Sequence, residues 1–240
     1  MKDIAIVYIC TGKYDVFWKD FYLSFEDKFI PTMSKDYYVF TDSDSIFGAE
    51  NENVHVIYQE NLGWPGNTLY RFQIFLSQKE ALKEYEYIFF MNANVICVDD
   101  VDESFLPKVE GLLFVQHPGF FNKSKFKFSY ERNHKSRAFM PVWAGKHYVC
   151  GGVNGGRSEY FLQMCEELKK RIDEDDKNGI VAVWHDESHI NRYCYEQKKY
   201  KILTPSYCYP EDWTIPFKPV LVVREKSKWI DVEKIKANEK

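Results

Sequence analysis

The chain has 240 residues, of which 45% are hydrophobic and 18% aromatic, so it can bury a substantial core and general disorder is excluded. Its 32 basic and 36 acidic residues give a net charge of −4, which argues against a nucleic-acid-binding protein. The six cysteines form no CxxC pair, so we expect reduced thiols rather than disulfides.

The N-terminal sequence MKDIAIVYIC has an apolar run that is too short to cross a membrane, and it lacks a signal-peptide cleavage pattern. No later run approaches the length of a spanning helix. We therefore predict a soluble, cytoplasmic protein with no membrane partner and no nucleic-acid partner.

The first half of the chain alternates predicted strands with predicted helices. The strands are apolar runs at residues 4–10, 37–42, 53–59 and 85–97. The helices are indicated by Phe17, Phe21 and Phe25 at helical spacing and by the pattern of residues 68–85, which follows a loop, LGWPGN. This alternation predicts a parallel α/β sheet.

Polar groups follow three of these strands, at residues 11–14, 41–42 and 92–94. Ligands of parallel sheets bind beyond the carboxyl ends of the strands. We therefore expect these three groups to face one crevice.

The second half is less regular. Residues 111–121, GLLFVQHPGFF, predict a strand that runs into a turn, and residues 159–175 predict a helix. We find no linker and predict one domain. It divides into a first half at about 1–98, a second half at about 99–220, and a basic tail at 221–240.

The stretch AVWHDESHIN places His185 and His189 four residues apart, on one face of a helix. A zinc protease helix needs H-E-x-x-H, but Asp186 follows the first histidine and Glu187 comes one place late. That shift turns the carboxylate about 100° from the position of a general base. The simplest alternative is a helix start with Asp186 as its N-cap.

Two other stretches are chemically suggestive. CGGVNGG, from Cys150 to Gly156, is not a dinucleotide fingerprint, and its glycines predict tight turns or a close approach of the backbone to a ligand. MNANV ends a buried strand with Asn92 and Asn94, whose side chains point to one face. An ordinary strand-end turn would also account for these two asparagines.

Several stretches together resemble one family. YVFTD, HPGFF, YER, GG-x-x-GG and above all WHDESHIN are similar to the retaining glycosyltransferases that include the histo-blood-group A and B transferases and the α-1,3-galactosyltransferases. The resemblance runs from about residue 4 to residue 204, and the sequence resembles a soluble bacterial member without the anchor and stem of the animal enzymes. It implies a glycosyltransferase-A fold, a Rossmann-like mixed sheet flanked by helices in a single domain.

The resemblance also implies an activity, the transfer of Gal or GalNAc from a UDP-sugar to O3 of a galactose acceptor. Glu187 matches the catalytic carboxylate of the family. The matching donor contacts are Ile9, Cys10, Thr11, Tyr14, Arg71, Asn92, Ala93, Asn94, Cys150, Gly151, Gly152 and Asp186. Asn67 and Lys226 are two further donor contacts that we expect. The matching acceptor contacts are His117, Trp184 and Glu187. The acceptor-binding aspartate of the family has no clean counterpart in YCYPEDW, where Glu211 or Asp212 is expected to substitute. The resemblance thus implies a nucleotide-binding half at about 1–98 and an acceptor and catalytic half at about 99–220.

Residues 150–152 match the triplet that tunes donor choice, and the small Gly152 resembles members that accept an N-acetyl group. We therefore expect UDP-GalNAc as donor, with UDP-Gal as the alternative. The blood-group-like resemblance suggests a fucosylated galactoside, Fucα1,2-Gal, as acceptor.

The sequence departs from the family at its metal motif, D-x-D, which here reads Asn92-Ala93-Asn94. Mg²⁺ and Mn²⁺ at a pyrophosphate favour anionic oxygen ligands, which amides do not supply. Bacterial relatives with N-x-N are metal-independent transferases, so we expect no metal ion and no other cofactor. Neutralisation of the leaving UDP is then expected from Lys226 first, then Arg224 and Lys228, with help from Lys13 or Arg71.

The chemistry of retention stays open at this point. Glu187 could attack the donor sugar as a nucleophile or stabilise a same-face, ion-pair-like transition state. Two other classes of protein also stay open, a catalytically dead sugar-binding relative and a zinc hydrolase built on His185 and His189.

Overall fold

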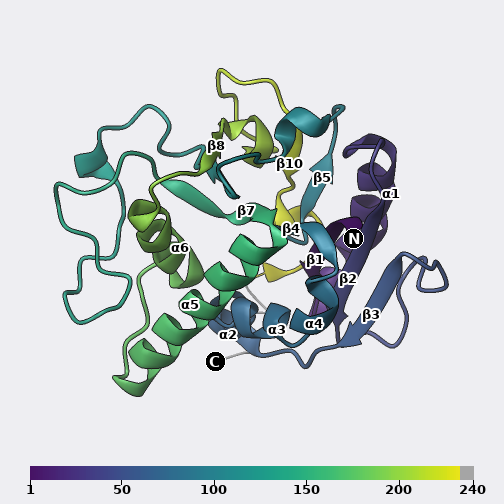
Figure 1. Ribbon diagram of the computed structural model, residues 1–240, viewed down its shortest axis with the longest axis horizontal. Helices are drawn as coiled ribbons and strands as arrows, with labels where there is room; N and C mark the ends of the chain where they lie inside the picture. Colours follow the sequence, from purple (N-terminus) through teal and green to yellow (C-terminus); the bar gives the residue numbers. More distant parts are fainter. Residues whose placement is uncertain (233–240) are drawn as a thin grey trace.

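The computed structural model describes residues 1–232 as one α/β domain built on a mixed seven-stranded sheet (Figure 1). The strand order is β3-β2-β1-β4-β7-β6-β8. The strands are β1 (Lys2–Ile9), β2 (Lys35–Thr41), β3 (Val54–Tyr58), β4 (Tyr85–Met91), β6 (Leu112–Gln116), β7 (Val149–Arg157) and β8 (Lys201–Leu203). This confirms the predicted fold class.

The first four strands, β1 to β4, run parallel, as predicted. β7 lies antiparallel to both β4 and β6, and β8 runs parallel to β6. Because β7 enters the sheet beside β4, the two halves of the chain share one sheet.

Helices and a small second sheet cover the two faces of the large sheet. Alternate residues of β1 face opposite cores: Ile4, Ile6 and Tyr8 pack with α1 (Trp18–Lys28), and Ala5 and Val7 pack with the other helices. These other helices are α2 (Gly63–Leu69), α3 (Arg71–Leu76), α4 (Lys79–Leu82), α5 (Ser158–Lys177) and α6 (His185–Glu196). Figure 1 shows α5 and α6 lying across this second face.

The small sheet has the order β5-β10-β9 and joins the tail to the first half of the chain. Its strands are β5 (Val95–Cys97), β9 (Tyr209–Pro210) and β10 (Leu221–Val223), and short 3₁₀ helices η1 (Gly12–Phe17), η2 (Glu103–Phe105), η3 (Lys125–Lys127), η4 (Pro205–Cys208) and η5 (Lys226–Lys228) complete the fold. β10 pairs antiparallel with β5, which follows the Asn92–Asn94 turn. The pairing therefore brings η5 to the end of β4.

Three predictions of local structure were wrong. Residues 68–85 form no single helix: Arg71 begins α3 after α2, and α4 is a separate turn, while the LGWPGN loop is partly helical. Asp186 is not an N-cap, because α6 begins one residue earlier, at His185. Residues 149–156 form no turns but lie inside the central strand β7.

The glycines of β7 are explained by close packing between strands. A Cβ atom on Gly155 would lie 2.3 Å from Cδ1 of Phe89 on β4 and 2.4 Å from the carbonyl oxygen of Ile88. Real Cβ atoms do not approach other atoms so closely, so any larger residue would push the two strands apart.

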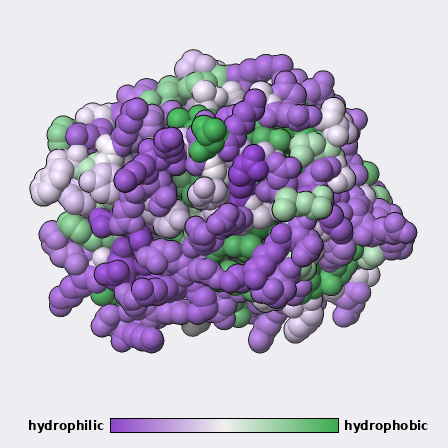
Figure 2. Space-filling view, viewed as in Figure 1, coloured by the Kyte–Doolittle hydropathy of each residue, from purple (hydrophilic) through white to green (hydrophobic). Residues whose placement is uncertain are grey.

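The surface of the molecule is mostly hydrophilic on the face of Figure 2, with hydrophobic side chains scattered between charged ones. Within residues 1–232, no helix has both the length and the apolar character needed to cross a bilayer. All six cysteines are free thiols and buried.

Candidate functional site

A cleft of about 290 Å³ opens beyond the carboxyl ends of β1 and β4. Three segments form its walls: the end of β1 with η1, the start of α2 and α3, and the turn after β4. The tail closes it through η5. The lining residues are Ile9, Thr11, Gly12, Lys13, Tyr14, Gly63, Trp64, Asn67, Thr68, Arg71, Phe90, Asn92, Ala93, Asn94, Lys226 and Val232.

Two of the three strand-end groups, residues 11–14 and 92–94, line the cleft as predicted. The third, residues 41–42, does not line it but contacts the loop after β1. The backbone N–H of Gly12 donates to Oδ1 of Asp42 at 2.7 Å, and Oγ1 of Thr41 donates to the carbonyl oxygen of Cys10 at 3.1 Å. The loops after β1 and β2 are therefore tied together. The Cys10 thiol itself is buried in the core, where desolvation raises its pKa to about 12.

Arg71 links the cleft to the start of α6. Its Nε lies 3.3 Å from Oδ2 of Asp186, and its Nη1 donates to the carbonyl oxygen of Gly151 at 3.4 Å. Both charged groups are buried, and burial raises the pKa of Asp186 to about 6 although Arg71 opposes the shift. Oδ2 of Asp186 accepts no hydrogen bond from any residue between 1 and 232, so this buried acceptor is available to a ligand.

Glu187 is held by hydrogen bonds to both of its carboxylate oxygens. Oε1 accepts from the hydroxyl of Tyr148 at 2.9 Å, and Oε2 accepts from the backbone N–H of Gly151 at 2.8 Å. Burial raises the pKa of Glu187 to about 7, while the two hydrogen bonds oppose that rise. The carboxylate is thus fixed in place and titrates near neutral pH, as a group in acid–base or nucleophilic chemistry would.

The Asn92–Asn94 turn and the Cys150–Gly152 segment are in direct contact. The backbone N–H of Asn92 donates to the carbonyl oxygen of Gly152 at 2.8 Å. A Cβ atom on Gly152 would lie only 2.7 Å from Nδ2 of Asn92. Two stretches that are about 60 residues apart in the sequence therefore shape the same wall.

The side chain of Asn94 binds the C-terminal tail. Its Nδ2 donates to the carbonyl oxygen of Arg224 at 2.6 Å, and the backbone N–H of Arg224 donates back to the carbonyl oxygen of Asn94 at 2.8 Å. This pair of bonds anchors the segment that carries Lys226, whose Nζ lies 5.0 Å from the ring centroid of Tyr14.

Only some of the predicted cations reach the cleft. Lys226, Lys13 and Arg71 line it, as predicted. Arg224 instead pairs with Asp20 at 2.8 Å and lies against the ring of Trp229. Lys228 pairs with Asp212 and with Glu211.

The cleft offers few ligands suited to a divalent metal ion. None of its described lining residues is an aspartate or glutamate. Nδ2 of Asn94 donates to Arg224, and its Oδ1, a neutral oxygen, accepts no hydrogen bond from residues 1–232. Hard divalent cations at phosphates need anionic oxygen ligands, which are missing from this wall. Over residues 1–232, no three His, Cys, Asp or Glu side chains are grouped as metal ligands.

The two histidines of WHDESHIN lie in different environments. His189 is buried with its Nε2 3.7 Å from Oδ2 of Asp175, and burial lowers its pKa to about 4. The ring of His185 packs against that of Trp64 at 4.8 Å. Within residues 1–232, His185 and His189 therefore do not combine with a third ligand to form the zinc site that a hydrolase would need.

The predicted acceptor residues are partly assembled. Nδ1 of His117 accepts from the backbone N–H of Gly119, and the His117 ring contacts that of Tyr148, the residue that binds Glu187. Trp184 is about half exposed immediately before α6. Glu211 accepts from the backbone N–H of Glu225 at 2.8 Å and thus holds the tail.

Sequence patterns did not single out Tyr148 or Trp64. Tyr148 immediately precedes β7 and is clamped by the rings of Phe120 and Tyr130, so only the fold shows that its hydroxyl reaches Glu187. The sequence predicts Trp64 only as part of the LGWPGN loop, whereas the structure places it in the wall of the cleft.

Comparison with known proteins identifies the family of the chain. The profile described as glycosyltransferase family 6 matches residues 2–235, nearly the whole chain. The chain belongs to glycosyltransferase family 6.

Bacterial and animal members of family 6 resemble it to different extents. The O-antigen biosynthesis glycosyltransferase WbnI of Escherichia coli is 37% identical over 225 residues, covering 94% of this chain and 95% of that protein. The histo-blood group ABO system transferase 1 of Rattus norvegicus is 31% identical over 215 residues, covering 87% of this chain and 61% of the rat protein. The globoside alpha-1,3-N-acetylgalactosaminyltransferase 1 of Homo sapiens is 28% identical over 217 residues, again covering 87% and 61%.

The chain thus spans nearly all of the bacterial relative but only about three fifths of these animal relatives. Family membership makes the protein a glycosyltransferase that uses a nucleotide-sugar donor and a glycan acceptor.

Proposed function

We propose that the protein transfers GalNAc from UDP-GalNAc to O3 of a galactose acceptor, with retention of configuration and without a metal ion. The observation that carries the proposal is the single wall formed by Asn92, Gly152 and Glu187, next to a cleft at the strand ends. It joins the donor-tuning triplet, the altered metal motif and the carboxylate in one place.

The donor is proposed to lie along the cleft from η1 to α6. Ile9, Thr11 and Tyr14 would contact the uridine, and Asn67 lies farther along the same cleft. The hexose would reach Arg71 and Asp186. Oδ2 of Asp186 forms an ion pair with Arg71 but accepts no hydrogen bond within residues 1–232, so it can accept one from a sugar hydroxyl. Cys10 would act by supporting this wall, since its thiol is buried in the core.

GalNAc is favoured over Gal by Gly152. Glycine has no side chain and therefore adds the least bulk to the wall beside the proposed donor, which leaves room there. A Cβ at this position would also lie 2.7 Å from Nδ2 of Asn92 and would displace that residue. An N-acetyl group needs that room, whereas a galactose hydroxyl does not.

Charge on the departing UDP is proposed to be neutralised by lysines. Lys226 and Lys13 both line the cleft, and the bonds between Asn94 and Arg224 fix the segment that carries Lys226. In a cleft without lining carboxylates, ammonium groups can take the place of a divalent ion next to the diphosphate.

In the transfer, the bond between C1 of the sugar and the UDP oxygen breaks, and its electron pair leaves with UDP. Acceptor O3 forms the new bond to C1 on the same face and passes its proton to the departing UDP oxygen. Glu187 either stabilises the positive charge that develops at C1 or bonds to C1 in a first displacement; in the second case, attack by O3 then breaks the bond between C1 and Glu187. Tyr148 and Gly151 hold both carboxylate oxygens and thereby set the direction from which Glu187 acts.

The acceptor is proposed to be a fucosylated galactoside bound near His117 and Trp184. Tyr148 joins His117 to Glu187, so this region adjoins the reacting carbon. Glu211 would contribute by holding the tail against the site. We also infer a bacterial cytoplasmic location, which is supported by the bacterial relative and suits buried free thiols.

A UDP-release assay tests the proposal. UDP-GalNAc and UDP-Gal are each given with Fucα1,2-Gal, with and without EDTA, and the product linkage is determined by NMR. We expect faster turnover with UDP-GalNAc, unchanged by EDTA, and an α-1,3 product. Preference for UDP-Gal would reverse the donor assignment, loss of activity in EDTA would overturn metal independence, and binding without turnover would identify a sugar-binding relative.

A further inference from the structure

The segment between β6 and β7 carries a basic charge that the rest of the chain lacks. Residues 118–147 contain seven basic residues and one acidic residue, whereas the whole chain has a net charge of −4. The acidic residue, Glu131, is buried and accepts from the backbone N–H groups of Asn133 and Val183. It therefore leaves the positive surface potential of this segment in place.

Large apolar side chains are exposed among these basic residues. Trp143 is 72% exposed, Phe126 67% and Val142 57%. Nζ of Lys125 donates to the carbonyl oxygen of Trp143 at 2.7 Å and lies 5.7 Å from the ring centroid of Phe126. Lys125 thus brings the two aromatic residues onto one surface.

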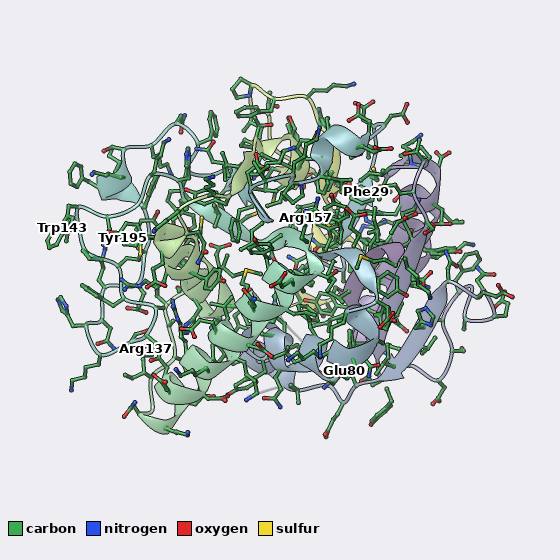
Figure 3. All side chains as sticks on the ribbon, in the orientation of Figure 1. Phe29, Glu80, Arg137, Trp143, Arg157 and Tyr195 are labelled. Carbon is green, nitrogen blue, oxygen red and sulfur yellow. The ribbon has the colours of Figure 1, made fainter. Side chains whose placement is uncertain are left out.

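We name this surface the basic-aromatic patch and define it as Lys125, Phe126, Lys127, Trp143 and Lys146. Trp143 and Lys146 also line a shallow depression of about 250 Å³ together with Tyr195, close to which two more exposed lysines follow α6 at 198–199. Figure 3 shows Trp143 and Tyr195 on the same side of the molecule, at its edge.

The patch lysines are not neutralised by the protein. Lys125, Lys127 and Lys146 form no ion pair with any residue of the described part of the chain. Elsewhere, several lysines do have carboxylate partners, as Lys79 has Glu166 and Lys218 has Asp99. The positive charge of the patch is therefore exposed to solvent and available to a binding partner.

We propose that the basic-aromatic patch docks the protein onto an anionic lipid bilayer. Lysines attract the phosphates of anionic headgroups, while tryptophan and phenylalanine insert at the level of the headgroups. A dissolved polyanion would use the lysines but would leave Phe126 and Trp143 in water. The combination of both kinds of side chain favours the bilayer.

Docking at this patch would orient the active cleft. The segment starts at His117 and ends at Tyr148, whose hydroxyl binds Glu187. A bilayer held against its outer part would therefore lie on the acceptor side of the site. The proposal does not depend on the identity of the sugar donor or on activity.

The prediction of no membrane partner rested on the lengths of apolar runs, which concern only segments that span a bilayer. Association with a bilayer surface depends on exposed side chains, so it was not addressed by that criterion.

Vesicle flotation tests the proposal with the intact protein. We expect binding to vesicles of phosphatidylcholine with phosphatidylglycerol, little binding to phosphatidylcholine alone, and release at about 0.5 M salt, where charges are screened within a few ångströms. Lys127→Gln/Lys146→Gln should weaken the partition coefficient about 25-fold, at about fivefold for each lysine near the surface. Phe126→Ser/Trp143→Ser should weaken it about tenfold or more by removing inserted apolar area.

Matched controls separate the patch from general charge and hydrophobicity. Lys19→Gln/Lys108→Gln removes two exposed lysines elsewhere, and Tyr58→Ser removes an aromatic side chain that is 79% exposed on β3. Both should bind vesicles like the wild type, and thermal melts should show that all variants fold. Equal losses in the controls, no vesicle binding, or loss in the lysine pair alone would overturn the proposal; the last result would mean that charge alone drives binding and that the aromatic side chains do not insert.

Discussion

The two halves of this molecule build the site in different ways. The first half places its groups at the ends of parallel strands: Thr11 after β1 and Asn92 after β4 reach the cleft because of sheet topology alone. The second half places Glu187 by contacts between distant segments, since Tyr148 precedes β7 and Glu187 lies on α6.

Because of this difference, mutations in the two halves should lower activity in different ways. Groups at strand ends are held by a rigid sheet, so their loss removes one interaction. Groups held by non-local hydrogen bonds also depend on their supporting residues. The following predictions test this comparison.

Glu187→Gln should have the largest effect. It keeps the shape of the side chain but removes the charge that we propose acts at C1, and we expect kcat to fall about 10³-fold, or about 4 kcal/mol of transition-state stabilisation. UDP affinity, measured by calorimetry, should change little. Wild-type kcat in this variant would remove Glu187 from the mechanism, and trapping of a glycosyl-enzyme in the wild type would support the covalent route.

Lys226→Ala should come next, with a decrease in kcat of about 10²-fold, because it removes a cation beside the leaving diphosphate. Single-turnover kinetics would measure the chemical step, and thermal melts would show little change in stability. Lys228→Ala is the matched control, since Lys228 pairs with Asp212 and Glu211 outside the cleft. Equal losses in the two variants would contradict the assignment.

Tyr148→Phe should lower kcat about tenfold, the effect of one hydrogen bond to a charged group. The hydroxyl of Tyr148 lowers the pKa of Glu187, which burial raises to about 7. If the carboxylate is the active form, activity rises with pH through about 7, and removal of the hydroxyl should shift this limb of the kcat/KM profile to higher pH. A lower kcat with an unshifted profile would indicate only structural support.

Gly152→Ala should have the smallest effect on overall turnover and the clearest effect on donor choice. The new Cβ would lie 2.7 Å from Nδ2 of Asn92, so the wall must shift. We expect kcat/KM for UDP-GalNAc to fall about tenfold relative to UDP-Gal, a typical effect of one methyl group in a specificity pocket. An unchanged ratio would separate donor choice from Gly152.

Local sequence patterns determined much of the first half. The apolar runs and phenylalanine spacing predicted β1, α1 and the parallel arrangement of β1 to β4, because hydrophobic periodicity reflects which face is buried. The resemblance of the motifs predicted the family, and the match of the family profile to residues 2–235 confirms this prediction. The convergence of the ends of β1 and β4 on one crevice followed from topology.

Only the tertiary structure decided how the second half is arranged. The glycines of residues 149–156 predicted turns, but packing against Phe89 requires them inside a strand. Asp186 was predicted as a cap, but the structure buries it against Arg71. The partner of Glu187, Tyr148, lies 39 residues away, and no local pattern carries contacts of that kind because they arise when separate elements pack together.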